Sequence, residues 1–266
     1  MVDFQCKERY DYADLLQIMK VLRAPGGCPW DGEQTHESIR RDFLEETCEA
    51  VEAIDRADMT GLCEELGDVL LQVVFHAQIE TEKGGFTMDD VVNGICQKLV
   101  YRHPHVFGHT QVSGSDEVLV NWDALKRKEK GQATAADAVD AVARTLPGLW
   151  RAEKIQSKAG KAGFVWPDVQ GKLAEEVEEL REAAESGAPA DAPHGVREEV
   201  GDVLFMAVQV ARAHGVDPED ALHRACDKFA VRFRRTEELA DGAMKEMSPE
   251  ELVACWQKAK EQESES

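Results

Sequence analysis

Carboxylate side chains recur in this sequence at a spacing that suits metal binding. The stretch "FLEETCEAVEAI" places Glu46 and Glu49 three residues apart, and "CEELGDVLLQVVF" does the same with Glu65 and Asp68. Residues three apart share one face of a helix, so each pair projects in one direction. The second pair opens an apolar run that predicts a buried helix. Ionised carboxylates in such a setting are costly to desolvate.

The same two motifs return in the second half of the chain. There "LAEEVEELREAA" and "REEVGDVLFMAVQ" supply Glu176, Glu179, Glu199 and Asp202. Like charges about 4 Å apart repel by roughly 1 to 4 kcal/mol. A hard divalent cation would offset this repulsion, and a set of oxygen ligands without His or Cys favours Mg²⁺, with Mn²⁺ as the alternative. A lone Glu-Glu-x-x-Glu is more often a solvated helix face, but the recurrence of both motifs favours a metal site.

Two basic residues four apart follow the acids in each half, Lys98 with Arg102 and Lys228 with Arg232. Each pair lies on one face of a predicted helix and suits contacts to phosphate groups. The alternative is that they close salt bridges onto the acids. Near the C-terminus, Trp256 offers a flat aromatic face on which a planar ring can stack. A core or dimer-interface position for Trp256 remains the alternative.

The repeated acid motifs and basic pairs indicate two tandem copies of one unit. Large apolar residues are lost in "KEKGQATAADAVDAVA", and we expect the domains to cover residues 1–130 and 131–266. Apolar residues recur at helical spacing without a run of period-two alternation, which predicts an all-α fold with a helical bundle in each copy. The segment "SGAPADAPHG" predicts a loop inside the second copy. Helix starts are predicted at Thr87, Asp217 and Ser248.

The composition argues against several classes of protein. A net charge of -21 does not suit nucleic-acid binding, which needs clustered Lys and Arg. No apolar run approaches the roughly 18 residues of a membrane span, and the N-terminus has no basic leader followed by an apolar stretch. Seven scattered cysteines without a Cys-x-x-Cys pair predict reduced thiols and a cytoplasmic location.

The acid motifs resemble the signature of the MazG family of nucleoside triphosphate pyrophosphohydrolases. The two motifs are separated by 14 residues in the first copy and by 18 in the second. The segments "GGCPWDGEQTHESIRRDFLEE" and "KLVYRHPHVFG" are similar to full-length, two-domain members, and the resemblance covers nearly the whole chain. It implies an all-α fold and Mg²⁺-dependent hydrolysis of NTPs and dNTPs to a nucleoside monophosphate and pyrophosphate. Broad base specificity and a role in nucleotide-pool clearance are further expectations.

The resemblance also implies roles for individual residues. The metal ligands would be Glu46, Glu49, Glu65 and Asp68 in the first copy, and Glu176, Glu179, Glu199 and Asp202 in the second. The carboxylates expected to take part in catalysis are Glu45, Glu46, Glu175 and Glu176. Of these, Glu45 or Glu175 would accept the proton of the attacking water, since neither is fully used as a ligand. The resemblance favours the second copy as the main catalytic site, although the first retains every acid.

Two alternative functions have to be weighed against nucleotide hydrolysis, and the apolar surface predicts a partner chain. A di-iron carboxylate bundle needs Glu-x-x-His motifs, but the residues three after Glu46 and Glu65 are Glu49 and Asp68. A non-catalytic nucleotide sensor or helical interaction module would keep the same metal and phosphate contacts, and the sequence does not exclude it. A unit of three or four helices with this much apolar surface predicts a homodimer.

Overall fold

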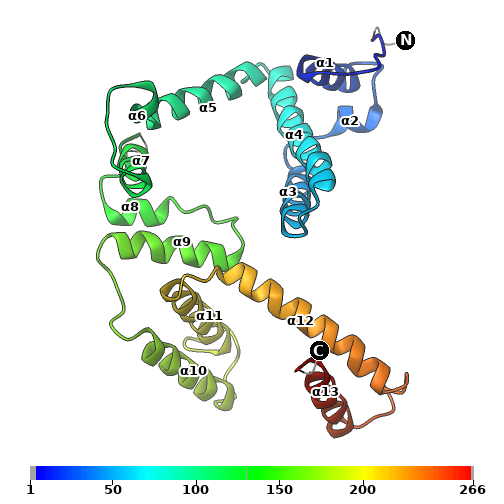
Figure 1. The fold of residues 1–266 in the computed structure, drawn as a ribbon, viewed down its shortest axis with the longest axis vertical. Coiled ribbons are helices and arrows are strands. Elements are labelled where there is room, and N and C mark those ends of the chain that lie inside the picture. Colours follow the sequence, from blue (N-terminus) through cyan, green and yellow to red (C-terminus); the bar gives the residue numbers. More distant parts are fainter. Residues whose placement is uncertain (1–3, 130, 265–266) are drawn as a thin grey trace. The chain divides into compact units, whose positions relative to one another are not determined.

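The computed structural model describes residues 4–129 and 131–264, and every regular element within them is a helix (Figure 1). This confirms the predicted all-α fold class. The helices up to residue 129 are α1 (Tyr12–Arg23), α2 (Pro29–Glu33), α3 (Arg40–Asp55), α4 (Met59–Glu82), α5 (Met88–Arg102), α6 (Pro104–Phe107) and α7 (Ser115–Glu129). Those that follow are α8 (Ala135–Asp140), α9 (Gly148–Lys161), α10 (Val169–Glu185), α11 (Val196–Ala213), α12 (Pro218–Leu239) and α13 (Pro249–Ser264).

The chain divides into two compact units, of which the first ends at Leu125 and the second begins at Lys126. The boundary expected from the sequence falls at Lys130, which lies outside the described residues, and it stays a prediction. Each unit contains one long antiparallel helix pair, α3 with α4 and α10 with α11. These pairs contain the repeated acid motifs, so the tandem repeat is confirmed at the level of the helices.

A short link and a small core hold the first pair together. Residues 56–58 join α3 to α4, and the Asp58 carboxylate caps α4 by accepting from the backbone N–H groups of Thr60 and Gly61 at 3.1 and 2.9 Å. The C-terminal half of α4 packs on α1 and on the segment before α3. The core residues of this unit are Met19, Ile39, Val74, Phe75 and Ile79. This half of the apolar run is therefore buried, as predicted.

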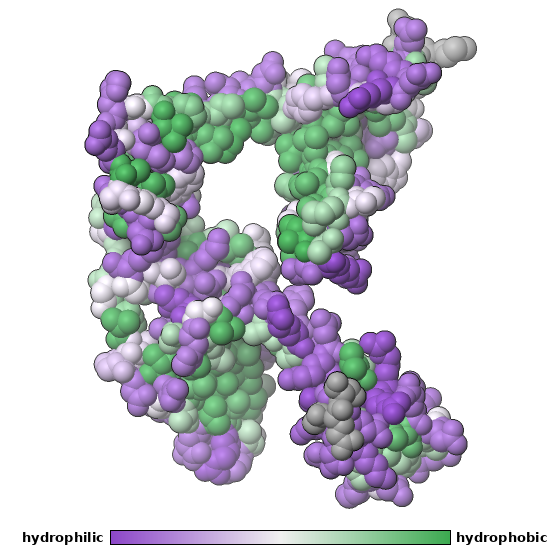
Figure 2. Space-filling model, viewed as in Figure 1, coloured by the Kyte–Doolittle hydropathy of each residue, from purple (hydrophilic) through white to green (hydrophobic). Residues whose placement is uncertain are grey.

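The start of the apolar run is not buried, and that part of the prediction was wrong. Leu66 and Leu70, which flank the carboxylates of α4, are 54% and 37% exposed. Leu204 at the matching place in α11 is 50% exposed. The helices packed on α4 and α11 within each unit cover only the other flank, so an apolar strip borders each acid motif. Figure 2 shows a further gathering of hydrophobic residues over α5, where Ile95 and Val100 are about half exposed.

The predicted loop "SGAPADAPHG" joins α10 to α11 over residues 186–195. It folds tightly against the start of α11, where a Cβ on Gly195 would lie 2.7 Å from the carbonyl oxygens of Ala190 and Ala192. Only glycine fits this approach. The predicted helix starts are also confirmed, because the side chains of Thr87, Asp217 and Ser248 each accept a hydrogen bond from a backbone N–H in the first turn.

Candidate active site

The α3–α4 pair brings the first acid motifs together. Glu46 and Glu49 on α3 and Glu65 on α4 each offer an oxygen within 4.8 Å of the other two. This follows from the short link, because an antiparallel turn over residues 56–58 sets the middle of α3 beside the first turns of α4. Asp68, one turn further along α4, belongs to the same group, since its charge acts on both Glu46 and Glu65. The cluster is half-exposed on the surface of the pair.

Repulsion within this cluster is visible in the pKa values. Burial raises the pKa of Glu46, and the charges of Asp68 and Glu49 raise it further. The pKa of Glu65 is raised first by burial and then by the charge of Glu49. A cation among these oxygens would relieve the repulsion. The donor set is therefore suited to a hard divalent cation.

The α10–α11 pair builds a deeper version of the cluster. Oxygens of Glu176, Glu199 and Asp202 lie within 4.8 Å of one another, and Glu176 and Glu199 are only 7% and 5% exposed. Burial raises the pKa of Glu179, and a hydrogen bond with Glu176 raises it further. The pKa of Asp202 is raised by burial and then by the charge of Glu176. All four predicted residues thus belong to one interacting group.

A lysine that the sequence did not single out lies against this group. The ammonium nitrogen of Lys172 is 2.9 Å from Glu175 Oε1 and 3.0 Å from Glu176 Oε1, and both carboxylates raise the pKa of Lys172. In the first half the matching residue is Asp42, whose charge adds to the rise in the pKa of Glu46. The only sequence indication was a spacing of four before Glu176, which is common on helices.

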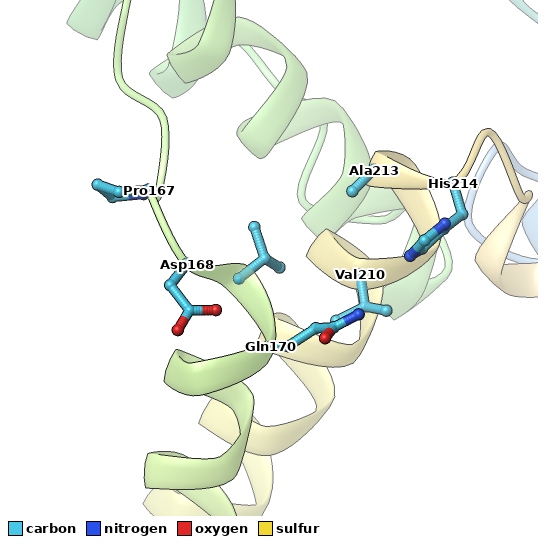
Figure 3. A pocket seen from close by; sticks show the side chains of 7 residues that line it. Pro167, Asp168, Gln170, Val210, Ala213 and His214 are labelled. Carbon is cyan, nitrogen blue, oxygen red and sulfur yellow. The ribbon is translucent and has the colours of Figure 1, made fainter.

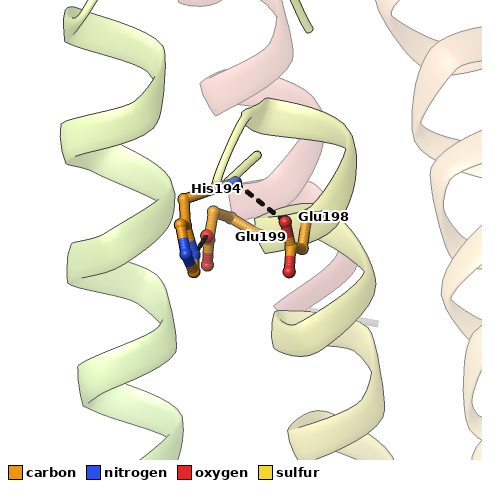
Figure 4. Close-up of side chains that lie close together, drawn as sticks. All are labelled: His194, Glu198 and Glu199. Carbon is orange, nitrogen blue, oxygen red and sulfur yellow. Dashed lines mark hydrogen bonds and ion pairs between the residues drawn. The ribbon is translucent and has the colours of Figure 1, made fainter. Parts of the chain in front are cut away.

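A histidine lies on the other side of the second cluster. The ring of His194 faces the carboxylate of Glu199, with Nδ1 and Oε1 3.8 Å apart, and its backbone N–H donates to Glu198 Oε2 at 2.8 Å (Figure 4). One donor atom from each of these three residues lies within 4.8 Å of the others. His194 could not be found from the sequence pattern, because the path of the loop before α11, rather than a helical spacing, brings its ring beside Glu199.

The predicted nucleotide-binding residues of the second half do not join the acids of α10 and α11 within the single chain. Helix α12 leaves α11 at the turn that joins them and runs beside α13 (Figure 1). Arg232, one turn after Lys228, donates through Nε to Glu263 of α13 at 2.7 Å. The ring of Trp256 packs on Phe229, with centroids 5.0 Å apart. These side chains form a separate aromatic and basic surface.

The first half places its basic pair in a similar way. Lys98 and Arg102 lie on the last turns of α5, and the guanidinium of Arg102 lies over the ring of Trp122 at 5.5 Å. His103 also packs edge-on against Trp122, with centroids 4.8 Å apart. Arg102 therefore makes an aromatic contact. The alternative function of the basic pairs was a salt bridge to the acids, and in the second half such a salt bridge is made by Lys172 instead.

A shallow pocket of about 200 Å³ lies elsewhere, between the start of α10 and the end of α11 (Figure 3). It is lined by Pro167, Asp168, Val169, Gln170, Val210, Ala213 and His214. None of the predicted site residues is among them, and Asp168 is occupied in capping α10 through the Gly171 N–H at 2.8 Å. The acid clusters, with their convergent carboxylates, remain the better candidates for chemistry.

Comparison with known proteins agrees with this geometry. The family model for the MazG nucleotide pyrophosphohydrolase domain matches residues 34–107 and 169–235, which include both acid clusters. The chain belongs to the MazG family. The family match in two regions confirms the resemblance seen in the sequence, including its tandem arrangement.

Full-length relatives support the assignment to the MazG family. The nucleoside triphosphate pyrophosphohydrolase/pyrophosphatase MazG of Thermotoga maritima is 43% identical over 94% of this chain and 95% of its own length. The nucleoside triphosphate pyrophosphohydrolase of Escherichia coli K12 is 42% identical over 94% of this chain and 97% of its own. An uncharacterized protein of Bacillus subtilis, YabN, is 43% identical over 97% of this chain but only 53% of that longer protein.

Two further features of this MazG-family chain bear on the sequence predictions. Within the described residues, none of the helices has the length and apolar character needed to cross a membrane. All seven cysteines are free thiols, as predicted.

Proposed function

We propose that this MazG-family chain hydrolyses nucleoside triphosphates to a nucleoside monophosphate and pyrophosphate, with the α10–α11 acid cluster as the main site. The observation that best supports this is the convergence of Glu176, Glu199 and Asp202, two of them buried, at the position of the family motif. Two full-length relatives with more than 40% identity are named for this activity.

The ligands proposed for Mg²⁺ are Glu176, Glu179, Glu199 and Asp202, with Glu46, Glu49, Glu65 and Asp68 as the equivalent set in the first half. The raised pKa values of Glu179 and Asp202 and the all-oxygen donor set fit a hard cation, and Mn²⁺ is the alternative. Bound metal would supply charge neutralisation at the triphosphate and a more acidic water. The carboxylates themselves would hold that cation, and without it their negative charge would repel the triphosphate.

The proton of the attacking water needs a nearby base, and Glu175 is the proposed acceptor in the second half. One oxygen of Glu175 accepts from Lys172 at 2.9 Å, which leaves the other available to a water molecule. In the first half, Glu45 holds the equivalent place and accepts from Arg41 Nε at 2.9 Å. Glu46 and Glu176, the neighbouring members of each motif, would share in this step as ligands.

Lys228 and Arg232 are proposed to hold the outer phosphates and Trp256 the base, with Lys98 and Arg102 as the first-half equivalents. Because α12 and α13 stand apart from the acids of the same unit, this role requires a second copy of the chain to bring the two surfaces together. We therefore keep a homodimer as part of the proposal. The exposed apolar strip beside each acid motif is the surface that such a dimer would cover.

The proposed contacts are to phosphates, metal and the face of a base, and none reads the edge of a base. This favours broad specificity among NTPs and dNTPs, and clearance of the nucleotide pool is the corresponding role. A cytoplasmic location remains a prediction, which rests on the free thiols.

The test is product identification. The purified chain would be incubated with each of the eight common nucleoside triphosphates and Mg²⁺, and the products separated by chromatography. Monophosphate plus pyrophosphate is expected. Diphosphate plus phosphate would mean attack at the outer phosphate, and bound but unreacted nucleotide would favour the sensor.

A further inference from the structure

The two acid clusters differ in one donor type. The first contains only carboxylates, whereas the second has the imidazole of His194 beside Glu199. When the "GDVL" segments of the two halves are aligned, the position of His194 is matched by Thr60, which lies within the first turn of α4. The nitrogen donor thus belongs to the second half, where the longer loop replaces a turn of helix.

The loop holds this donor in a defined place. His194 has a left-handed backbone with φ of 55°, and Gly195 beside it is locked against the carbonyl groups of Ala190 and Ala192. The backbone N–H of His194 donates a hydrogen bond to Glu198 Oε2 at 2.8 Å, which joins the loop to the first turn of α11. Arg197, in the first turn of α11, forms an ion pair with Asp191 of the loop.

Glu199 is the unusual member of the group. Its side chain is only 6% exposed, yet its carboxylate makes no hydrogen bond with any described residue. Its nearest basic partner is the His194 ring at 3.8 Å, beyond hydrogen-bond distance, and the two side chains point toward one another in Figure 4. A buried carboxylate in this state lacks a close positive partner.

We propose that His194, Glu198 and Glu199 form a second cation position, which shares the Glu199 carboxylate with the Glu176–Glu199–Asp202 set. The mixed nitrogen and oxygen donors suit a divalent transition ion such as Mn²⁺ better than Mg²⁺, which takes oxygen ligands. A carboxylate that bridges two cations is the arrangement of two-metal phosphate chemistry. The inference rests on the proposed function, because it concerns the same cluster, and it adds a nitrogen ligand that the acid motif does not contain.

The experiment is pulsed electron paramagnetic resonance on the full chain loaded with Mn²⁺, with Glu49→Gln and Glu65→Gln introduced to weaken the first cluster. Coupling of Mn²⁺ to ¹⁴N is expected, together with its loss in His194→Asn. Asparagine tolerates a left-handed backbone and offers oxygen instead of imidazole nitrogen, so the loop should be kept. His223→Asn, an exposed histidine on α12, is the matched control and should retain the coupling.

Binding of the free ions gives a second readout that does not depend on catalysis. His194→Asn is expected to weaken Mn²⁺ binding by about 10-fold and to leave Mg²⁺ binding nearly unchanged. Bound Mn²⁺ without ¹⁴N coupling, or coupling that survives His194→Asn, would overturn the histidine site while leaving the proposed function intact. If neither ion binds, the histidine site is overturned, and the product assay on the same sample then decides whether metal-dependent hydrolysis is overturned as well.

Discussion

At the scale of single residues, the two acid clusters differ in the charge of one neighbouring side chain, which is positive in the second half and negative in the first. Lys172 neutralises part of the second cluster, whereas Asp42 adds charge to the first. The acids themselves could be predicted, because a spacing of three fixes their direction on a helix. Lys172 and His194 could not be predicted in the same way. One has a spacing found on any charged helix, and the other reaches the site only through the path of a loop.

Replacing Lys172 with Gln tests its part in this balance. The change should lower the stability of the metal-free chain, since Glu176 would lose its close partner while staying buried. It should also tighten Mg²⁺ binding several-fold, because a competing cation is removed. Thermal unfolding with and without Mg²⁺ would measure both effects. Lys154→Gln on α9 is the control, and equal effects from both variants would argue against a specific role for Lys172.

At the scale of helices, the sequence predicted the elements well. Helix starts at Thr87, Asp217 and Ser248 were found from capping side chains, and the loop at 186–195 from its Gly and Pro content. The prediction failed at Leu66 and Leu70, which are exposed although their run reads as core. Periodicity shows which residues are apolar, but the packing of other helices decides which of them are covered.

One ion pair that joins elements gives a pH-dependent stability. Burial raises the pKa of Glu82, but hydrogen bonds from Arg23 and Gln78 outweigh this and leave it below its usual value. Arg23 Nε donates to Glu82 Oε1 at 3.0 Å, and its Nη1 donates to the backbone carbonyl of Asp31, so Arg23 links α1 and α4 to α2. A lowered folded-state pKa means that this stabilisation is present above about pH 4.3 and is lost as the pH falls through the folded value.

Glu82→Gln should therefore destabilise the chain by about 1 kcal/mol at pH 7, after allowance for solvent at this partly exposed side chain. The difference from the unmodified chain should shrink as the pH falls to about 3. Urea unfolding at both pH values would measure it. Glu52→Gln, which removes an exposed pair with Arg56, should change stability little at either pH. A difference for Glu82→Gln that persists at about pH 3 would contradict the linkage.

The loop before α11 supplies a second element-scale prediction. Gly195→Ala should cost about 1 to 3 kcal/mol, because the new methyl group would meet carbonyl oxygens at 2.7 Å. Gly201→Ala, inside α11 with open space around it, should stabilise the chain by up to about 1 kcal/mol. Denaturant unfolding of the two variants would compare them. Equal effects would mean that the loop does not pack tightly on α11.

At the scale of the whole molecule, the family and the tandem repeat could be predicted because both acid motifs are present twice. The relation between the acids and the basic pairs could not be predicted. It depends on the angle at which α12 leaves α11, and residue spacing does not determine that angle. The separation of Arg232 from the acids is the physical reason for expecting a second chain at the site.

Light scattering tests this expectation. The chain should be a dimer at micromolar concentration, and Leu204→Glu should shift it toward monomer by placing a charge on the apolar strip. Val165→Glu in the segment between α9 and α10, where the side chain is 68% exposed, is the comparison and should have little effect. A monomeric mass for the unmodified chain would contradict the dimer.

The most direct test of the proposed function is the rate of pyrophosphate release from a nucleoside triphosphate with Mg²⁺. It would be measured for the unmodified chain, for Glu179→Gln and for Glu49→Gln, with Glu182→Gln on α10 as the control. Glu179→Gln should lower the rate by roughly 100-fold or more, because it removes a proposed ligand of the cation that stabilises charge in the transition state, while Glu49→Gln has a smaller effect. Full pyrophosphate release by Glu179→Gln would contradict the assignment of the second cluster. Absence of pyrophosphate among the products of the unmodified chain would contradict the reaction itself.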